Sequence, residues 1–94
     1  MNKIIEGGCF CGLVRYSFES NDYLSANCHC SICRRTSGAP FISWMAIPLT
    51  YFEYNEGTPR KLISSSQGTR YFCKDCGTPL TCLLDEYPKY IYVT

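Results

Sequence analysis

The sequence has no hydrophobic run long enough to span a membrane, since its apolar stretches are all much shorter than about 18–20 residues. Its first eight residues also lack the apolar stretch of about 7–15 residues that marks a secretory signal. We therefore expect a cytoplasmic protein with no membrane partner. In the reducing cytoplasm, clustered cysteines are more often metal ligands than disulfides.

The sequence also has little net charge. Nine Lys and Arg residues against eight Asp and Glu give a formal net charge of +1. A nucleic-acid-binding domain usually has a basic excess, so we expect no nucleic-acid partner. With 46% hydrophobic and 18% charged residues, an intrinsically disordered chain is excluded. The 94 residues contain no linker, repeat or low-complexity tract, which predicts a single domain over residues 1–94.

What the sequence has in excess is cysteine, with eight in 94 residues. That proportion is typical of small domains whose cores are stabilised by disulfides or metals. A chain of this length buries only about 60–65% of the surface that it would expose when unfolded, so its core alone is marginal. We therefore expect some of the cysteines to contribute to folding stability.

Short β-type runs dominate the chain and predict a mainly β fold. Gly, Pro and Asn separate the runs at roughly 8–12 residue spacing, which is typical of a β-sandwich or barrel. Residues 13–18 alternate, with Val14, Tyr16 and Phe18 on one face. Further strands are expected at residues 41–47, 51–54, 61–65, 69–72, 80–84 and 90–93.

Two of these segments carry more specific expectations. Residues 41–47 are mostly apolar and are interpreted as a buried strand, with Trp44 in the core. One helical turn is expected at residues 31–36, because Gly38 and Pro40 would end it. The polar segment 64–68 is interpreted as a turn.

Seven of the eight cysteines fall in three short motifs. Two sulfurs separated by one or two residues can face one ion from a tight turn, as in tetrahedral thiolate zinc sites. A glycine after the last cysteine permits such a turn because it tolerates positive φ. The motifs are C-x-C-G at Cys9 and Cys11, C-x-C-x-x-C at Cys28, Cys30 and Cys33, and C-x-x-C-G at Cys73 and Cys76.

The spacing favours a division into four cysteines and three. A closed four-thiolate site would be structural, and its metal binding would add on the order of 10 kcal/mol to folding at neutral pH. A three-thiolate site would leave one position open, which is the mark of catalytic zinc. The four-thiolate set is Cys9, Cys11, Cys73 and Cys76, and the three-thiolate set is Cys28, Cys30 and Cys33.

Other interpretations of these cysteines remain open from the sequence. The first four could be redox or disulfide cysteines, and the other three could form a structural site with an extra ligand such as His29. His29 is a poor fourth ligand because adjacent side chains rarely reach one ion together. A zinc ribbon that pairs the C-x-x-C ending at Cys33 with the C-x-x-C ending at Cys76 is a further alternative. Cys82 lies in an apolar run and is interpreted as a small buried hydrophobe.

Three segments together resemble the glutathione-dependent formaldehyde-activating enzyme family, which includes centromere protein V. They are GCFCG at residues 8–12, CHCSICRRTSGAPF at 28–41 and RYFCKDCG at 70–77. The resemblance implies an Mss4-like fold of twisted antiparallel sheets. It also implies two zinc ions per chain, with the structural ion in the four-cysteine set and the catalytic ion in the three-cysteine set. Seven thiolates and two such ions would bring the net charge to about −2, which further disfavours a phosphate-backbone partner.

The activity that the resemblance implies is a carbon–sulfur lyase acting on the adduct of formaldehyde with glutathione. In that interpretation, His29 relays a proton, and Arg34 or Arg35 holds a glutathione carboxylate by a forked contact. Members of the family usually continue past the point that matches residues 90–94. An incomplete sheet would leave an open edge, at which a second copy could pair to form a homodimer.

Two other function classes are considered. A non-enzymatic, zinc-stapled binding module is compatible with the same cysteine pattern, although the chain lacks a basic tail. Methionine sulfoxide reduction would need a separate activated cysteine. Cys82 is the only unclustered candidate, and its neighbours are apolar.

Overall fold

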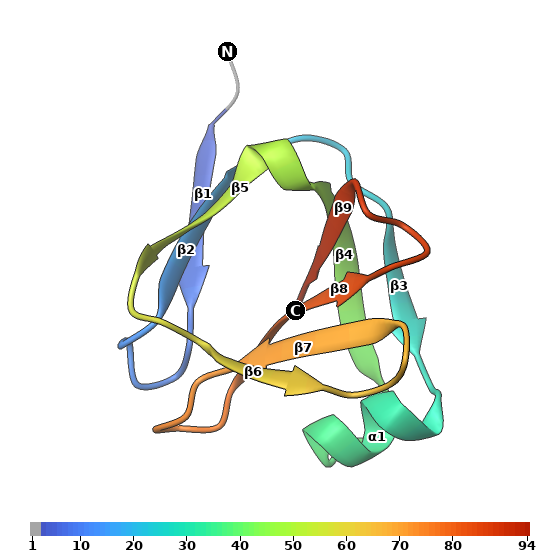
Figure 1. The fold of residues 1–94 in the computed structure, drawn as a ribbon. Helices are drawn as coiled ribbons and strands as arrows, with labels where there is room; N and C mark the ends of the chain where they lie inside the picture. The colour runs from blue at the N-terminus through green and yellow to red at the C-terminus, as the bar shows by residue number, and fades with distance from the viewer. Residues whose placement is uncertain (1–2) are drawn as a thin grey trace.

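The computed structural model describes residues 3–94 as two antiparallel sheets and one short α-helix (Figure 1). The smaller sheet has the order β1-β2-β5, and the larger has the order β3-β4-β9-β8-β7-β6. The prediction of a mainly β fold built from antiparallel sheets is confirmed. The elements are β1 (Ile4–Gly8), β2 (Arg15–Glu19), β3 (Ser25–Cys28), α1 (Ser31–Ser37), β4 (Ile42–Pro48), the 3-10 turn η1 (Leu49–Tyr51), β5 (Phe52–Glu56), β6 (Arg60–Ile63), β7 (Gly68–Phe72), β8 (Pro79–Leu84) and β9 (Tyr90–Val93).

Every expected strand and the expected helix are present, with bounds within two residues of the prediction. The predicted turn at residues 64–68 is also present, closed by a hydrogen bond from the Ser64 amide to the Gly68 carbonyl. Within residues 3–94, no helix has the length and apolar character that a membrane crossing needs.

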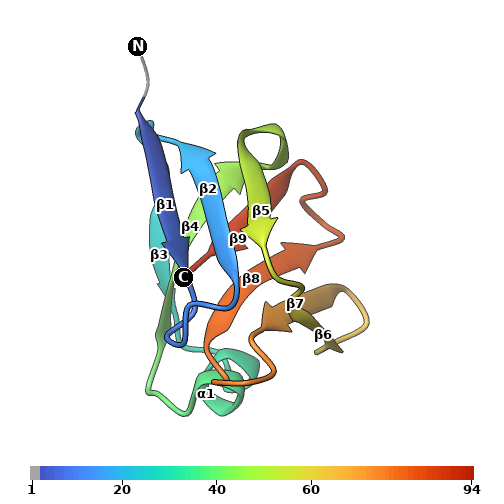
Figure 2. The same ribbon diagram turned by 90° about the vertical axis from the view of Figure 1, so that its left-hand side faces the viewer.

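The core lies between the two sheets. As predicted, Val14, Tyr16 and Phe18 share one face and are all buried. They pack against residues of β4 and β9 in the larger sheet, among them Ile47 and Val93. Figure 2 shows the smaller sheet lying across the larger one. Alternation in β2 therefore sets which side of the smaller sheet covers the core.

We predict that Ile47→Ala lowers the free energy of unfolding by about 2–5 kcal/mol. The Ile47 side chain is fully buried, so its loss leaves a cavity in the middle of the core. Urea denaturation of the metal-loaded protein measures the effect. Ile63→Ala is the matched control, because Ile63 is 70% exposed and its change should stay within about 0.5 kcal/mol. Equal effects of the two substitutions would contradict this placement of the core.

Two strands are present that the sequence pattern did not predict. β1 has three exposed residues followed by two glycines, so it shows neither alternation nor an apolar run. β3 is a short edge strand with small and polar residues that are mostly exposed. Both strands form through pairing with a neighbour, β1 with β2 and β3 with β4. Pairing of this kind leaves little local signal in the sequence.

The prediction of a fully buried strand at residues 41–47 with Trp44 in the core is wrong. In β4, Met45 and Ile47 lie on the core face, and Trp44 and Ala46 alternate with them on the other face. Trp44 is only half-buried, because it lies on the opposite face of the larger sheet, which the smaller sheet does not cover.

The larger sheet has open edges, but the last strand is not one of them. β9 is an inner strand, paired with β4 on one side and with β8 on the other. It pairs with β4 along its whole length and with β8 at Tyr92 and Val93. The edges of the larger sheet are β3 and β6. A homodimer stays a prediction that would have to use one of those edges or another surface.

Candidate metal centres

All three cysteine motifs lie toward one end of the molecule. The turn between β1 and β2, the turn between β7 and β8, and α1 are placed together at the lower end in both views (Figures 1 and 2). The chain brings these motifs together although they are separated by up to about two thirds of its length. The positions of the seven sulfurs in the structure therefore test the predicted division into a set of four and a set of three.

Four sulfurs form the first cluster, as the spacing predicted. The thiols of Cys9, Cys11, Cys73 and Cys76 all lie within 4.8 Å of one another. The Cys9–Cys11 sulfur distance is 3.5 Å and the Cys11–Cys73 distance is 3.7 Å. Sulfurs at about 2.3 Å from a tetrahedral zinc ion would be about 3.8 Å apart, whereas disulfide sulfurs are about 2.05 Å apart. All four cysteines are free, and this donor set fits a tetrahedral metal ion.

Two glycine turns hold this cluster. Gly12 has φ +82° and Gly77 has φ +80°, both in the left-handed region that glycine enters without steric cost. The Gly12 amide donates to the Cys9 carbonyl at 3.2 Å, and the Gly77 amide donates to the Cys73 carbonyl at 2.8 Å. The predicted role of a glycine after each cysteine pair is confirmed. Each turn directs two sulfurs toward the other turn.

Thr78 links the two turns. Its Oγ1 accepts a hydrogen bond from the Phe10 amide at 3.0 Å and lies 3.2 Å from the Cys76 sulfur. The Thr78 hydroxyl, with backbone amides, stabilises the thiolate and lowers the pKa of Cys76 to about 5. This thiol is therefore poised to bind a metal ion at neutral pH.

We predict that Thr78→Val shifts acid-induced metal release to higher pH. The folded state depresses the pKa of Cys76 from its usual 9.0 to about 5. Its contribution to stability is complete above the unfolded pKa and is lost as the pH falls through the folded pKa. Removing the hydroxyl raises the folded pKa, so protons displace the metal earlier during acidification. A metal-indicator titration measures the midpoint, with the exposed Thr58→Val as control. An unchanged midpoint would exclude this role of Thr78.

Three sulfurs form the second cluster. Cys28, Cys30 and Cys33 have thiols within 4.8 Å of one another, and the Cys28 and Cys30 sulfurs are 3.4 Å apart. Cys28 ends β3, and Cys30 is the N-cap of α1, where its sulfur accepts a hydrogen bond from the Cys33 amide at 3.4 Å. Cys33 is buried whereas Cys30 is exposed. The donor set fits a metal ion with three protein ligands.

The thiols of the second cluster differ in acidity. Hydrogen bonding from the Cys33 amide lowers the pKa of Cys30 to about 7. Desolvation raises the pKa of Cys28 to about 11. In the metal-free cluster, Cys30 therefore supplies the first thiolate, and a metal ion must displace the proton of Cys28.

The two clusters share no ligand. Cys30 and Cys33 group with Cys28, and neither groups with Cys73 or Cys76. The alternative zinc ribbon that would pair the two C-x-x-C motifs is therefore wrong, because the strands place them in separate turns.

An apolar cavity of about 470 Å³ lies beside the second cluster. Cys28 and Cys33 line it together with Trp44, Tyr92 and Cys82. Trp44 thus lies in a cavity wall, where the sequence predicted a core position. The cavity gives the three-cysteine cluster an accessible, mostly apolar side.

Cys82 is buried, as predicted, and it belongs to neither cluster. Burial raises the pKa of its thiol. A raised pKa is the opposite of what a redox nucleophile needs, so this thiol does not favour methionine sulfoxide reduction.

The other predicted site residues surround the second cluster at the surface. His29 is exposed, and its ring lies against that of Phe41 with centroids 5.1 Å apart. His29 does not belong to the set of side chains that could together hold an ion in this cluster. Arg34 and Arg35 follow Cys33 on α1, and both are exposed. These positions allow contact with a molecule that approaches from solvent.

One residue close to the second cluster was missed by the sequence analysis. Arg70 lies on β7, 37 positions after Cys33, and its Nη2 donates to the Cys33 sulfur at 3.3 Å. The motif RYFCKDCG includes Arg70, but nothing in its local pattern indicates a partner in α1. Only the pairing of β7 within the larger sheet brings the two residues together.

Comparisons with known proteins show which sequences the chain is similar to. Residues 4–94 match the family described as glutathione-dependent formaldehyde-activating enzyme. The chain is similar to an uncharacterized lyase of Schizosaccharomyces pombe, with 33% identity over 75 residues that cover 80% of this chain and 54% of that protein. It is also similar to a putative glutathione-dependent formaldehyde-activating enzyme of Halomonas elongata, with 31% identity over 97 residues, 95% of this chain and 62% of that protein. The chain thus spans less than two thirds of the length of these curated relatives.

A solved structure supports the fold. The crystal structure of a Rhodobacter sphaeroides protein has a TM-score of 0.80 with this chain at 24% identity, covering 95% of this chain and 83% of that one. Since the family match covers all but the first three residues, the chain belongs to the glutathione-dependent formaldehyde-activating enzyme family.

Proposed function

We propose that the chain is a zinc-dependent carbon–sulfur lyase acting on the adduct of a small thiol, such as glutathione, with formaldehyde or a related aldehyde. The observation that carries the proposal is the three-cysteine cluster, which has one exposed sulfur and an apolar cavity beside it. The family description and the name of the Halomonas elongata relative support the substrate class. We expect the reaction to take place in the cytoplasm, where thiols are kept reduced.

We further propose two zinc ions per chain with different roles. The four-cysteine cluster, in which Cys9 and Cys73 are buried, would hold a structural ion. The three-cysteine cluster would hold the second ion with one position left open. Zinc bound there supplies a positive centre that lowers the pKa of an incoming thiol.

The proposed reaction joins the thiol to the aldehyde. The thiol sulfur forms a bond to the carbonyl carbon, the C=O π electrons move to the oxygen, and the thiol proton ends on that oxygen. The product is a hydroxymethyl thioether, and the reverse reaction releases the thiol and formaldehyde. No oxidant or reductant is needed, because the step is an addition across the carbonyl group.

The exposed residues around the cluster would bind substrate and move the proton. His29 would carry the proton from the thiol sulfur to the new hydroxyl oxygen through its imidazole, which lies against Phe41. Arg34 and Arg35 would hold a carboxylate of glutathione from the exposed side of α1. Cys28, Cys30 and Cys33 would remain metal ligands throughout.

The test is the rate of adduct formation from glutathione and formaldehyde, followed by magnetisation-exchange NMR at equilibrium. The zinc-loaded chain is expected to increase the exchange rate above the uncatalysed rate, and chelation of zinc should abolish the increase. A chain that binds two zinc ions without accelerating exchange would overturn the proposal and favour a non-enzymatic binding module.

A further inference from the structure

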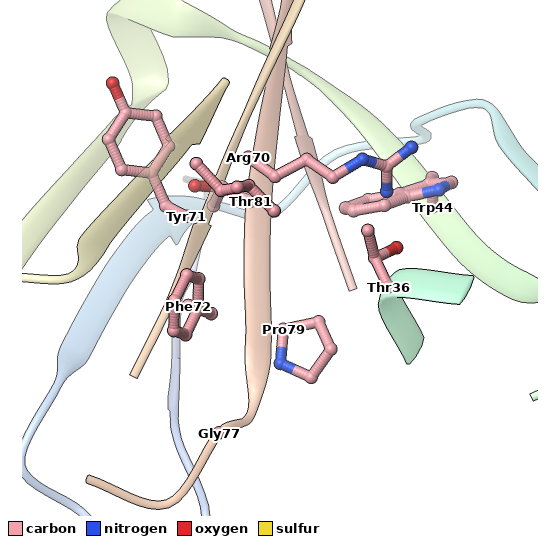
Figure 3. A pocket seen from close by; sticks show the side chains of 9 residues that line it. Thr36, Trp44, Arg70, Tyr71, Phe72, Gly77, Pro79 and Thr81 are labelled. Carbon is pink, nitrogen blue, oxygen red and sulfur yellow. The ribbon is translucent and has the colours of Figure 1, made fainter. Parts of the chain in front are cut away.

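The Arg70 side chain contacts a cysteine of the second cluster and two residues elsewhere in the structure. Its Nη2 lies 3.3 Å from the Cys33 sulfur, and its Nε lies 3.3 Å from the Ser64 hydroxyl. Its guanidinium carbon is 5.5 Å from the centroid of the Trp44 ring. Figure 3 shows the guanidinium beside that ring, where both residues line a cavity of about 270 Å³. The side chain is thus held at three points.

The turn at residues 64–68 sets the position of this side chain. The Ser64 hydroxyl donates to the Gly68 carbonyl at 3.3 Å and accepts from Arg70 Nε. The Ser64 amide donates to the same carbonyl at 3.1 Å. A hydroxyl fixed in this way orients the planar guanidinium, so that its far end reaches α1.

A metal-loaded cluster would carry a net negative charge, which a positive group beside it would offset. Three thiolates and one divalent ion have a net charge of −1, and an incoming thiolate would make it −2. A guanidinium group carries a positive charge that can offset this negative charge. A hydrogen bond from a guanidinium to a thiolate is charge-assisted and stronger than a neutral one.

We propose that Arg70 is a positioning residue for the three-cysteine cluster, where its guanidinium fixes the Cys33 sulfur and offsets the negative charge of the thiolates. The inference rests on the proposed function in that it assumes a metal ion in this cluster. Arg34 and Arg35 are closer to Cys33 in sequence, but they are exposed on α1 and are suited to substrate. Arg70 reaches the cluster from β7 and contacts the sulfur of Cys33, which is a proposed metal ligand.

The experiment measures Co²⁺ binding to the full chain by competition with a chelator, using the thiolate-to-cobalt absorption as readout. Arg70→Met is expected to weaken the second binding step by about 10- to 100-fold, the range found for residues that support metal ligands. The first step, at the four-cysteine cluster, should be unchanged. Arg60→Met removes the same charge from the exposed face of β6, outside both clusters, and should change neither step by more than about twofold.

Two further variants separate the role of Arg70 from a loss of folding. Arg70→Lys keeps the charge but not the planar fork, so its affinity should lie between those of wild type and Arg70→Met. Ser64→Ala leaves Arg70 in place and removes only the hydroxyl that orients it, and it should weaken the second step in the same direction. If Arg70→Met fails to fold, the affinity of Ser64→Ala for the second Co²⁺ tests the inference instead. An unchanged second binding step in Ser64→Ala would then overturn the inference.

The outcomes distinguish this inference from the proposed function. If wild type binds only one Co²⁺, the second metal site is absent and both proposals fall. If wild type binds two and Arg70→Met binds the second with wild-type affinity, the inference about Arg70 is wrong and the proposed function stands. A second step weakened in Arg70→Met but not in Arg60→Met supports the inference.

Discussion

Replacing Cys73 by serine is expected to unfold the chain. The Cys73 side chain is almost completely buried and lies in the four-sulfur cluster that joins the β1–β2 turn to the β7–β8 turn. A hydroxyl is a poor zinc ligand, so the structural ion would be lost. Its binding free energy, on the order of 10 kcal/mol, is comparable to the whole stability of a small domain at about 5–15 kcal/mol.

The measurement is circular dichroism during thermal unfolding in the presence of equimolar zinc. Cys73→Ser should show no cooperative transition, whereas wild type should melt cooperatively. Cys82→Ser is the matched control, since Cys82 is equally buried but belongs to neither cluster. It should lose only about 1–3 kcal/mol, the cost of burying a hydroxyl. Similar melting of the two variants would show that the four-cysteine cluster does not stabilise the fold.

Replacing Cys30 by serine is expected to remove catalysis while the fold remains. Cys30 is exposed and is the N-cap of α1, a position at which serine is among the preferred residues. The helix should therefore start normally, but the second metal site would lose one of its three thiolates. The rate of adduct exchange should fall to that of the uncatalysed reaction.

NMR exchange with glutathione and formaldehyde measures this rate, alongside circular dichroism as a check on folding. Ser31→Ala is the control, because Ser31 is the next residue on α1, is exposed and contributes no sulfur. It should retain the wild-type rate within about twofold. A folded Cys30→Ser protein with the wild-type rate would rule out the open metal site.

The cysteine clusters could be predicted from sequence because their information is local. Two sulfurs one or two residues apart share a turn, and Gly12 and Gly77 mark the turns that do so. The division into four and three followed from the number and spacing of the cysteines in the three motifs. The alternation of Val14, Tyr16 and Phe18 was equally informative, since it reports directly which face of a strand is buried.

Features that depend on pairing between distant segments could not be predicted. Ile4–Gly8 and Ser25–Cys28 are strands only because β2 and β4 lie beside them. Trp44 was assigned to the core because its neighbours are apolar, but the side of a strand that a second sheet covers is a tertiary property. The contact between Arg70 and Cys33 likewise depends on the position of β7 within the larger sheet.

The position of β9 shows the same limit. β9 is the last strand in the sequence, yet it does not lie at an edge, because an antiparallel sheet can insert its last strand between two earlier ones. Here β9 pairs with β4 through Met45 and Val93 and with β8 through Thr81 and Val93. A search for a dimer interface should therefore begin at β3 and β6, the edges of the larger sheet.

Metal content per chain tests the division of the cysteines most directly. Protein purified under reducing conditions and saturated with zinc would be analysed by native mass spectrometry, which counts the ions on each molecule. We predict two zinc ions on wild type and one on a folded Cys30→Ser protein. A single ion on wild type that Cys30→Ser leaves in place, or no ion at all, would contradict the account.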